Sequence, residues 1–132
     1  MPTPPWLTPL YRPEAISIGG LVTLTNVGAS YDTIAAARGL GCAYVDMTNV
    51  MSIDFRVMCN KVGTGTQDWQ LWNETDAAEV GVISDAGAAG NKTLSTTFSG
   101  LALTGKKLLR VRARSSTAAD DPVYYGSCIT LN

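Results

Sequence analysis

The run Ser52-Ile-Asp-Phe-Arg-Val-Met-Cys-Asn-Lys61 alternates between two kinds of side chain. One set of alternate positions holds Ile53, Phe55, Val57 and Cys59, and the other holds Asp54, Arg56, Met58 and Asn60. Successive side chains of a β-strand point to opposite sides, so the first set would face a core and the second would face water or a partner. The pattern predicts a half-buried β-strand.

A second run, Lys107–Arg114, alternates in the same way. Its apolar side is Leu109, Val111 and Ala113, and its outward side is Arg110, Arg112 and Arg114. Further runs bounded by turn residues predict six more strands: Leu21–Val27, Cys42–Met47, Asp68–Asn73, Ala78–Ser84, Lys92–Phe98 and Val123–Leu131. About eight short strands without a long helix predict an all-β, antiparallel, jelly-roll-like sandwich. The stretch Tyr31–Gly41 fits either a helical turn or a weak strand.

The chain has 132 residues, and five of its six prolines lie in the first thirteen. Proline lacks a backbone donor, so this segment fits neither a helix nor a central strand. We therefore expect an extended arm at residues 1–14 and one sandwich domain at residues 15–132. The arm carries four large apolar side chains: Trp6, Leu7, Leu10 and Tyr11. They could anchor it in a groove of another subunit, or the arm could fold back on its own domain.

Composition excludes several classes of function. Histidine is absent, which excludes Ser-His-Asp and Cys-His catalysis. Two carboxylates could still hydrolyse a glycoside, but nothing in the sequence pairs any two, and we expect no enzymatic activity. The net charge is −1, which predicts no nucleic-acid partner. No apolar run has membrane-spanning length, and the first residues do not form a signal peptide, so we expect synthesis in a cytoplasm and no membrane partner.

The sequence also gives little indication of metal binding or of reactive cysteines. Cys42, Cys59 and Cys128 are odd in number and far apart, which argues against disulfides and zinc and favours buried, reduced thiols. Asp120 and Asp121 could bind calcium in a loop, or serve only to cap it. We expect no cofactor and no resident metal.

Two groups of outward side chains are candidates for a binding surface. Arg110, Arg112 and Arg114 form a basic stripe, and Arg56 would lie beside it if the two strands are neighbours. Asp54 and Glu74 are available to pair with these arginines, so the stripe is either ion-paired or a contact for an anionic protein surface. Trp69 and Trp72 fall on opposite sides of one strand. If Trp69 is in the core, Trp72 points outward and could stack on a sugar ring or contact a protein.

Two segments resemble a known class of proteins. They are Val62-Gly-Thr-Gly-Thr-Gln-Asp-Trp-Gln-Leu-Trp-Asn-Glu-Thr-Asp-Ala-Ala-Glu-Val-Gly, and Leu108-Leu-Arg-Val-Arg-Ala-Arg-Ser-Ser-Thr followed by Val123-Tyr-Tyr-Gly. Together they are similar to β-sandwich structural proteins of tailed bacteriophages, over roughly residues 52–131. The resemblance implies a virion role, and it carries over no catalytic residues.

The resemblance and the arm together predict a capsid decoration protein that clamps a shell through subunit contacts. Its partners would be the major capsid protein or another virion protein, and its own copies, with a trimer favoured by capsid symmetry. Its location would be the virion. The alternative is a carbohydrate-binding β-sandwich module, for example of a phage fibre or tail, that uses Trp72.

Overall fold

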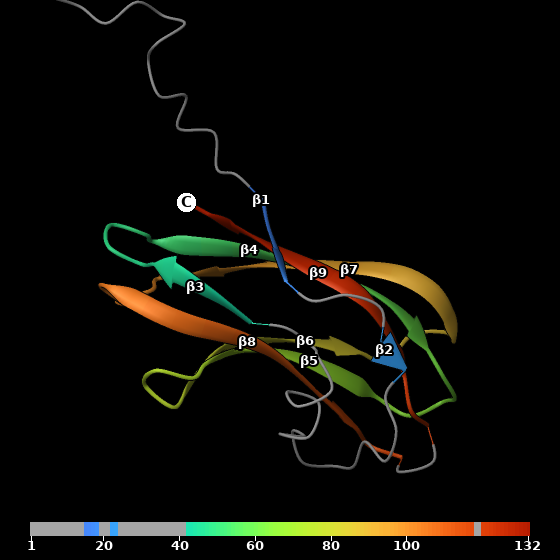
Figure 1. The fold of residues 1–132 in the computed structure, drawn as a ribbon. Coiled ribbons are helices and arrows are strands. Elements are labelled where there is room, and N and C mark those ends of the chain that lie inside the picture. The colour runs from blue at the N-terminus through green and yellow to red at the C-terminus, as the bar shows by residue number, and fades with distance from the viewer. Residues whose placement is uncertain (1–14, 19–21, 24–41, 118–119) are drawn as a thin grey trace, which may run out of the picture.

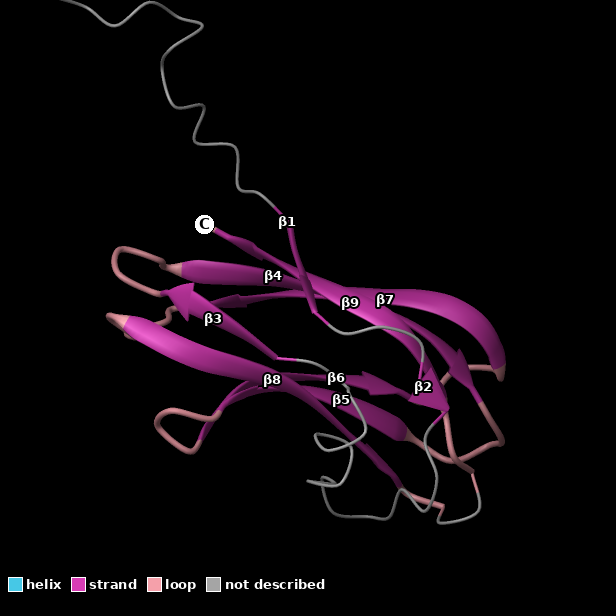
Figure 2. Cartoon of the chain, viewed as in Figure 1, coloured by secondary structure: helices cyan, strands magenta, loops and turns pink. Residues whose placement is uncertain are grey.

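The computed structural model describes residues 15–18, 22–23, 42–117 and 120–132, which Figure 1 draws in colour. The predicted arm at residues 1–14, with Trp6, Leu7, Leu10 and Tyr11, lies outside the described residues. So does the ambiguous stretch at residues 31–41. Figure 2 shows only strands and loops in the described part of the chain, and no helix there is long and apolar enough to cross a membrane.

Nine strands make up the described fold: β1 (Ala15–Ile18), β2 (Val22–Thr23), β3 (Cys42–Asp46), β4 (Ser52–Lys61), β5 (Gln67–Asn73), β6 (Ala78–Asp85), β7 (Gly90–Ser99), β8 (Lys106–Ser115) and β9 (Val123–Leu131). One sheet has the order β1-β9-β4-β7, with β2 also paired to β9, and the other has the order β3-β8-β5-β6. All pairs are antiparallel.

The two sheets lie face to face, and the chain crosses between them repeatedly (Figure 1). From β3 to β9 only β5 and β6 are sequential neighbours in one sheet, which gives the jelly-roll order. This confirms the predicted antiparallel sandwich. The predicted strand at residues 21–27 is described only as the two residues of β2, and the rest of that run lies outside the described residues.

The core lies between β4 and β9 of one sheet and β5 and β8 of the other. Ile53, Phe55, Val57 and Cys59 are all buried, as the alternation of β4 predicts. The same holds for the apolar side of β8, Leu109, Val111 and Ala113. Trp69 of β5 and Tyr124 of β9 pack across the two sheets at 5.7 Å between ring centroids. Phe55 packs against Phe98 of the adjacent strand β7 in its own sheet, at 5.8 Å.

A buried polar contact attaches the short strand β1 to this core. The Ile18 carbonyl oxygen accepts a hydrogen bond from the Tyr124 hydroxyl, and the Ser127 hydroxyl lies 3.0 Å from the same carbonyl and 2.7 Å from the tyrosine oxygen. Tyr124, Ser127 and Ile18 are all buried. Because buried polar groups are costly unless they are hydrogen-bonded, this group of three determines where β1 lies on β9.

Two lysines hold the loop between β6 and β7. The Lys61 ammonium is buried and donates to the Gly87 carbonyl at 2.6 Å, and the Lys92 ammonium donates to the Ala88 carbonyl at 2.6 Å. Asp85 completes the cluster, because its Oδ1 accepts from Lys92 at 3.1 Å and from the Gly87 amide at 3.0 Å. The loop backbone is therefore anchored to the ends of β4 and β7.

Gly81 of β6 lies directly under the Phe98 ring. A methyl group at this position would come within 2.2 Å of the ring, which is too close for any contact between carbon atoms. We expect Gly81→Ala to lower the free energy of unfolding by about 1–3 kcal/mol, because the ring and the backbone must move apart. Urea unfolding measures this loss. In the double variant Gly81→Ala/Phe98→Leu, the loss of unfolding free energy should be smaller than the sum of the losses in the two single variants. Strictly additive losses would contradict the predicted contact.

Two buried acidic groups predict a loss of stability at high pH. Burial raises the pKa of the Cys59 thiol from 9.0 to about 11, and burial raises the pKa of the Tyr124 hydroxyl from 10.0 to about 12. Both groups ionise more readily in the unfolded chain, so their stabilisation is complete below pH 9 and is lost as pH rises toward 12. Urea unfolding between pH 7 and pH 11 should show a decline on the order of 2–4 kcal/mol.

The control for this decline is the variant Cys59→Ala/Tyr124→Phe, which has neither ionisable group. It should be less stable than the native chain at neutral pH, because a buried thiol and hydroxyl are lost. Its stability should nevertheless change less between pH 9 and pH 11. An equally steep decline in both proteins would show that other groups cause it.

Candidate functional site

The outer face of the β3-β8-β5-β6 sheet carries the predicted arginine stripe. Arg110, Arg112 and Arg114 of β8 all point away from the core, as predicted. Arg110 pairs with Glu74 at 3.1 Å, and Arg114 pairs with Asp68 at 2.6 Å. The ion-paired interpretation of the stripe is therefore confirmed for these two arginines.

Trp72 lies on the same outer face, as predicted, but one face of its ring is covered by another side chain. The tryptophan is half-buried, and the centre of the Arg112 guanidinium lies 4.4 Å from the centroid of its ring. A cation at this distance is attracted to the π-electrons and covers one face of the ring. The neighbouring Gln70 donates to Glu79 at 2.7 Å. The side chains of this face therefore contact each other, and Arg112 occupies one face of the Trp72 ring.

The condition under which Arg56 would lie beside the stripe is not met. Arg56 and Asp54 belong to β4, and β4 and β8 are in different sheets. Both residues face outward, so Arg56 lies on the opposite side of the molecule from Arg110, Arg112 and Arg114. For the same reason Asp54 is not a partner of the stripe, and Asp68 takes that place.

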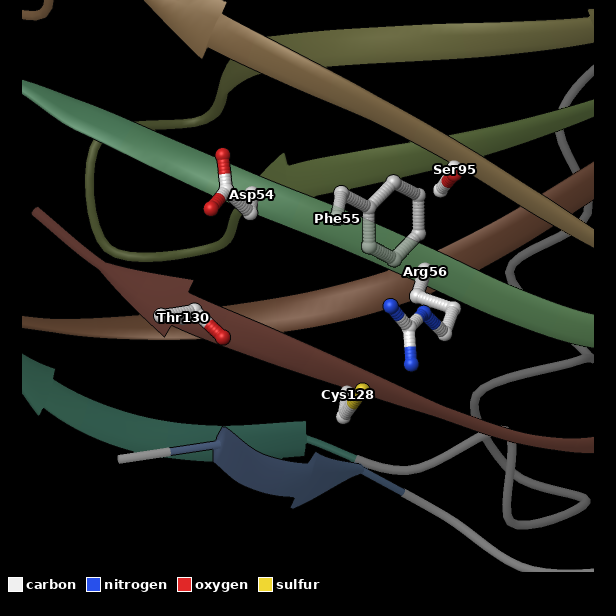
Figure 3. A pocket seen from close by; sticks show the side chains of 6 residues that line it. All are labelled: Asp54, Phe55, Arg56, Ser95, Cys128 and Thr130. Carbon is white, nitrogen blue, oxygen red and sulfur yellow. The ribbon is translucent and has the colours of Figure 1, made fainter. Parts of the chain in front are cut away.

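The outer face of the five-stranded sheet holds a groove of about 130 Å³ (Figure 3). It is lined by Asp54, Phe55, Arg56, Ser95, Cys128 and Thr130. The strand register brings these residues together: Asp54 lies opposite Thr130, and Arg56 lies between Ser95 of β7 and Cys128 of β9. In Figure 3 the Arg56 side chain bends from β4 over β9 toward Cys128.

The polar groups of this groove are mostly unengaged. Asp54 Oδ1 accepts a hydrogen bond from the Thr97 hydroxyl at 2.6 Å. Within the described part of the chain, no hydrogen bond or ion pair is made by the Arg56 guanidinium or by the hydroxyls of Ser95 and Thr130. The groove therefore presents donors and acceptors that remain available to a ligand, whereas the opposite face presents mainly paired charges.

An exposed aromatic side chain lies on the same face, near the far end of β4. Tyr125 is 41% exposed, and its hydroxyl donates to Asn91 of β7 at 2.8 Å. Beside it lies Met58, which is 39% exposed and paired with Gly126. From Met58 to Asp54 the face extends four residues along β4, or about 13 Å at about 3.3 Å per residue. Tyr125, Arg56 and Asp54 thus border one elongated polar surface.

Tyr125 faces outward because of a bulge that the sequence analysis missed. The register between β4 and β9 shifts at Met58/Cys59, so that Met58 pairs with Gly126 and Cys59 with Tyr124, and Tyr125 is the extra residue. Gly126 adopts φ of 145°, which glycine tolerates best. A glycine inside a strand pattern is the sequence signal for such a bulge, and Tyr124-Tyr125-Gly126 carries that signal.

The cysteines differ from the prediction that all three are buried. Cys59 is buried, but Cys42 is exposed on the edge strand β3 and Cys128 is half-buried at the groove. Cys42 and Cys128 occupy outward positions of their strands, opposite Arg110 and Arg56. Among the described residues, no three His, Cys, Asp or Glu side chains gather as a metal site, and this includes Asp120 and Asp121.

The comparisons with known proteins find similarity in structure alone. No family model and no curated protein matches the sequence. The solved carbohydrate-binding module CBM36 in complex with calcium and xylotriose is similar over 90% of this chain and 99% of its own, with a TM-score of 0.55 and 14% identity. This likeness establishes a shared β-sandwich fold, and at such low identity it establishes nothing further.

Two other solved structures are more distant. The CBM22-1–GH10 modules of Clostridium thermocellum xylanase 10B match 88% of this chain at a TM-score of 0.42 and 14% identity, and this chain spans 26% of their length. The Bacillus endospore appendage that forms disulfide-linked pili matches 89% of this chain and 89% of its own at a TM-score of 0.40 and 17% identity. Neither similarity is close enough to support an argument about this protein.

The difference between the two outer faces predicts that removing an arginine affects stability far less on the outer face of β4 than on the outer face of β8. Arg56→Ala should change the free energy of unfolding by less than about 0.5 kcal/mol, because the guanidinium is exposed and engages no described group. Arg114→Ala should lower it by about 1–3 kcal/mol, because Asp68, which is only 7% exposed, loses a charged partner. Urea unfolding of the two variants tests this. Equal effects would show that the faces do not differ in this way.

Proposed function

We propose that this chain is a carbohydrate-binding β-sandwich module. Its ligand is an oligosaccharide that lies along β4 on the outer face of the five-stranded sheet. The observation that carries the proposal is the groove of about 130 Å³ with an unengaged Arg56 guanidinium and unengaged Ser95 and Thr130 hydroxyls. Sugars offer many hydroxyl groups, and a site of this kind supplies both donors and acceptors for them.

Each part of the surface has a distinct role in this proposal. Arg56 donates to sugar oxygens, and Asp54 accepts from sugar hydroxyls through the oxygen that Thr97 does not occupy. Tyr125 packs its exposed ring against an apolar face of a sugar, and its bond to Asn91 fixes the orientation of the ring. A surface about 13 Å long accommodates more than one sugar ring, which favours an oligosaccharide over a single sugar.

The fold likeness to a module solved with xylotriose adds support to this proposal. The site proposed here differs from the one anticipated from the sequence, since it uses Tyr125 and Arg56 instead of Trp72. The virion decoration role, its capsid partner and the trimer remain predictions from the sequence resemblance, from capsid symmetry and from the arm, which lies outside the described residues. The absence of enzymatic activity is likewise still a prediction.

Binding of the purified full chain to a panel of plant, bacterial and host-surface polysaccharides tests the proposal. Affinity electrophoresis finds the ligand, and calorimetry with its oligosaccharides measures the affinity. We expect Arg56→Ala and Tyr125→Ala each to weaken binding at least about tenfold, which corresponds to about 1.4 kcal/mol. Neither change should unfold the domain, because both side chains are exposed.

Tyr44→Ala is the matched control. Tyr44 is a more exposed tyrosine, at 76%, and it lies on β3 in the other sheet. This variant should bind like the native chain. The proposal fails if no polysaccharide binds, or if Tyr44→Ala abolishes binding while Tyr125→Ala leaves it intact.

A further inference from the structure

One edge of the five-stranded sheet is long, regular and unpaired among the described strands. β7 (Gly90–Ser99) pairs with β4 over ten residues without a register shift, and no described strand pairs with its other side. Every second residue of β7 directs its backbone amide and carbonyl toward that side, and these groups therefore lack a strand partner within the described chain. Such an edge is a template for another strand.

β7 has few of the features that usually protect an edge strand, and its one charged side chain, the inward Lys92, lies near the start of the strand and pairs with Asp85 at 3.1 Å. The strand contains no proline and no bulge, and its outward side chains are all uncharged: Asn91, Thr93, Ser95, Thr97 and Ser99. The edge strand of the other sheet, β6, has both a register shift at Leu71/Trp72 of its partner and the charge of Glu79. The remaining edge strands are short, with four residues in β1, two in β2 and five in β3. Among the described edges, only β7 combines a length of ten residues with an uncharged segment, residues 93–99, that has no proline and no bulge.

The inward side of β7 also carries apolar surface that the domain covers incompletely. Leu94 and Phe98 point toward the core but are only half-buried, although both pack against it. Phe98 lies over Gly81 of β6, where it covers the gap between the two sheets at this edge. An added strand would cover these side chains and pair the free backbone groups at once, which is what β-strand addition provides.

We propose that β7 is the interface of a symmetric dimer, in which the β7 strands of two copies pair antiparallel. A two-fold axis at Thr96 places Thr96 of one copy opposite Thr96 of the other. It places Leu94 of each copy opposite Phe98 of the partner subunit, so this apolar pair occurs twice. Lys92 then falls opposite Gly100, beyond the end of the paired segment. Apolar side chains lie opposite apolar ones, and uncharged polar side chains lie opposite uncharged polar ones, so the strand is complementary to itself in this register.

The second copy fits this edge better than an unrelated peptide does. In the two-fold register, residues 93–99 of one copy pair with the same segment of the other copy, and no like charges lie opposite each other in it. It also joins the two five-stranded sheets into one continuous sheet. The outward row Thr93, Ser95 and Thr97 is then continued by the same row of the partner, so the two grooves share one face. The dimer itself does not depend on sugar binding.

A charge exchange at the axis tests the proposal. Thr96→Lys places two lysines opposite each other in the dimer, and Thr96→Glu places two glutamates there. Sedimentation equilibrium should show a dimer for the native chain and a dissociation constant at least about tenfold higher for each variant alone. An equal mixture of the two variants should restore the dimer, because each pair then has opposite charges. The recovery excludes misfolding as the cause of dissociation.

Ser84→Lys is the control, because it adds the same charge to an exposed position of β6 in the other sheet. It should leave the dimer intact. The proposal is overturned if the native chain is monomeric at all concentrations, if it forms a trimer, or if the dimer persists in both Thr96 variants. It is also overturned if the mixture of variants stays monomeric while each variant is folded by circular dichroism.

Discussion

The position of β4 between β9 and β7 is the constraint on which the rest of the structure depends. Because its side chains alternate, β4 gives one side to the core through Phe55 and Val57 and the other side to solvent through Asp54 and Arg56. A shift of one residue in its register would exchange these two sides and bury both charges. Core packing therefore also determines where the groove lies, since the groove is the outer side of the same strand.

The two outer faces of the sandwich show that arginines in similar outward positions differ in whether their guanidinium groups are available to a ligand. On β8 the arginines lie beside acidic groups of β5 and the following turn, so Arg110 and Arg114 are held in ion pairs. On β4 the cross-strand neighbours of Arg56 are Ser95 and Cys128, which carry no opposite charge. A guanidinium without a paired carboxylate retains its donors for a ligand. Availability thus follows from neighbours on adjacent strands, and charge alone does not predict it.

Much of the polar surface inside and at the ends of the sandwich serves to position strands. Tyr124 and Ser127 attach β1 through the Ile18 carbonyl, and Lys61 and Lys92 hold the loop between β6 and β7. The edge strand β7 is continuous, since its start is anchored at the loop and its whole length is paired with β4 without a register shift. The regularity that stabilises the domain also leaves an edge that a second copy can extend.

The amino-acid sequence alone determined the local structure: the strands, the sides of β4 and β8 that face the core, and the inward Trp69 and outward Trp72. Period-two alternation is a property of neighbouring residues, so no long-range information is needed to recognise it. Tertiary structure decided which strands are neighbours. It separated Arg56 from the other arginines, placed Arg112 over Trp72, exposed Cys42 and turned Tyr125 outward through a bulge in β9. Strand order and bulges arise from packing between segments far apart in the chain, and that packing leaves little trace in the local pattern of any one strand.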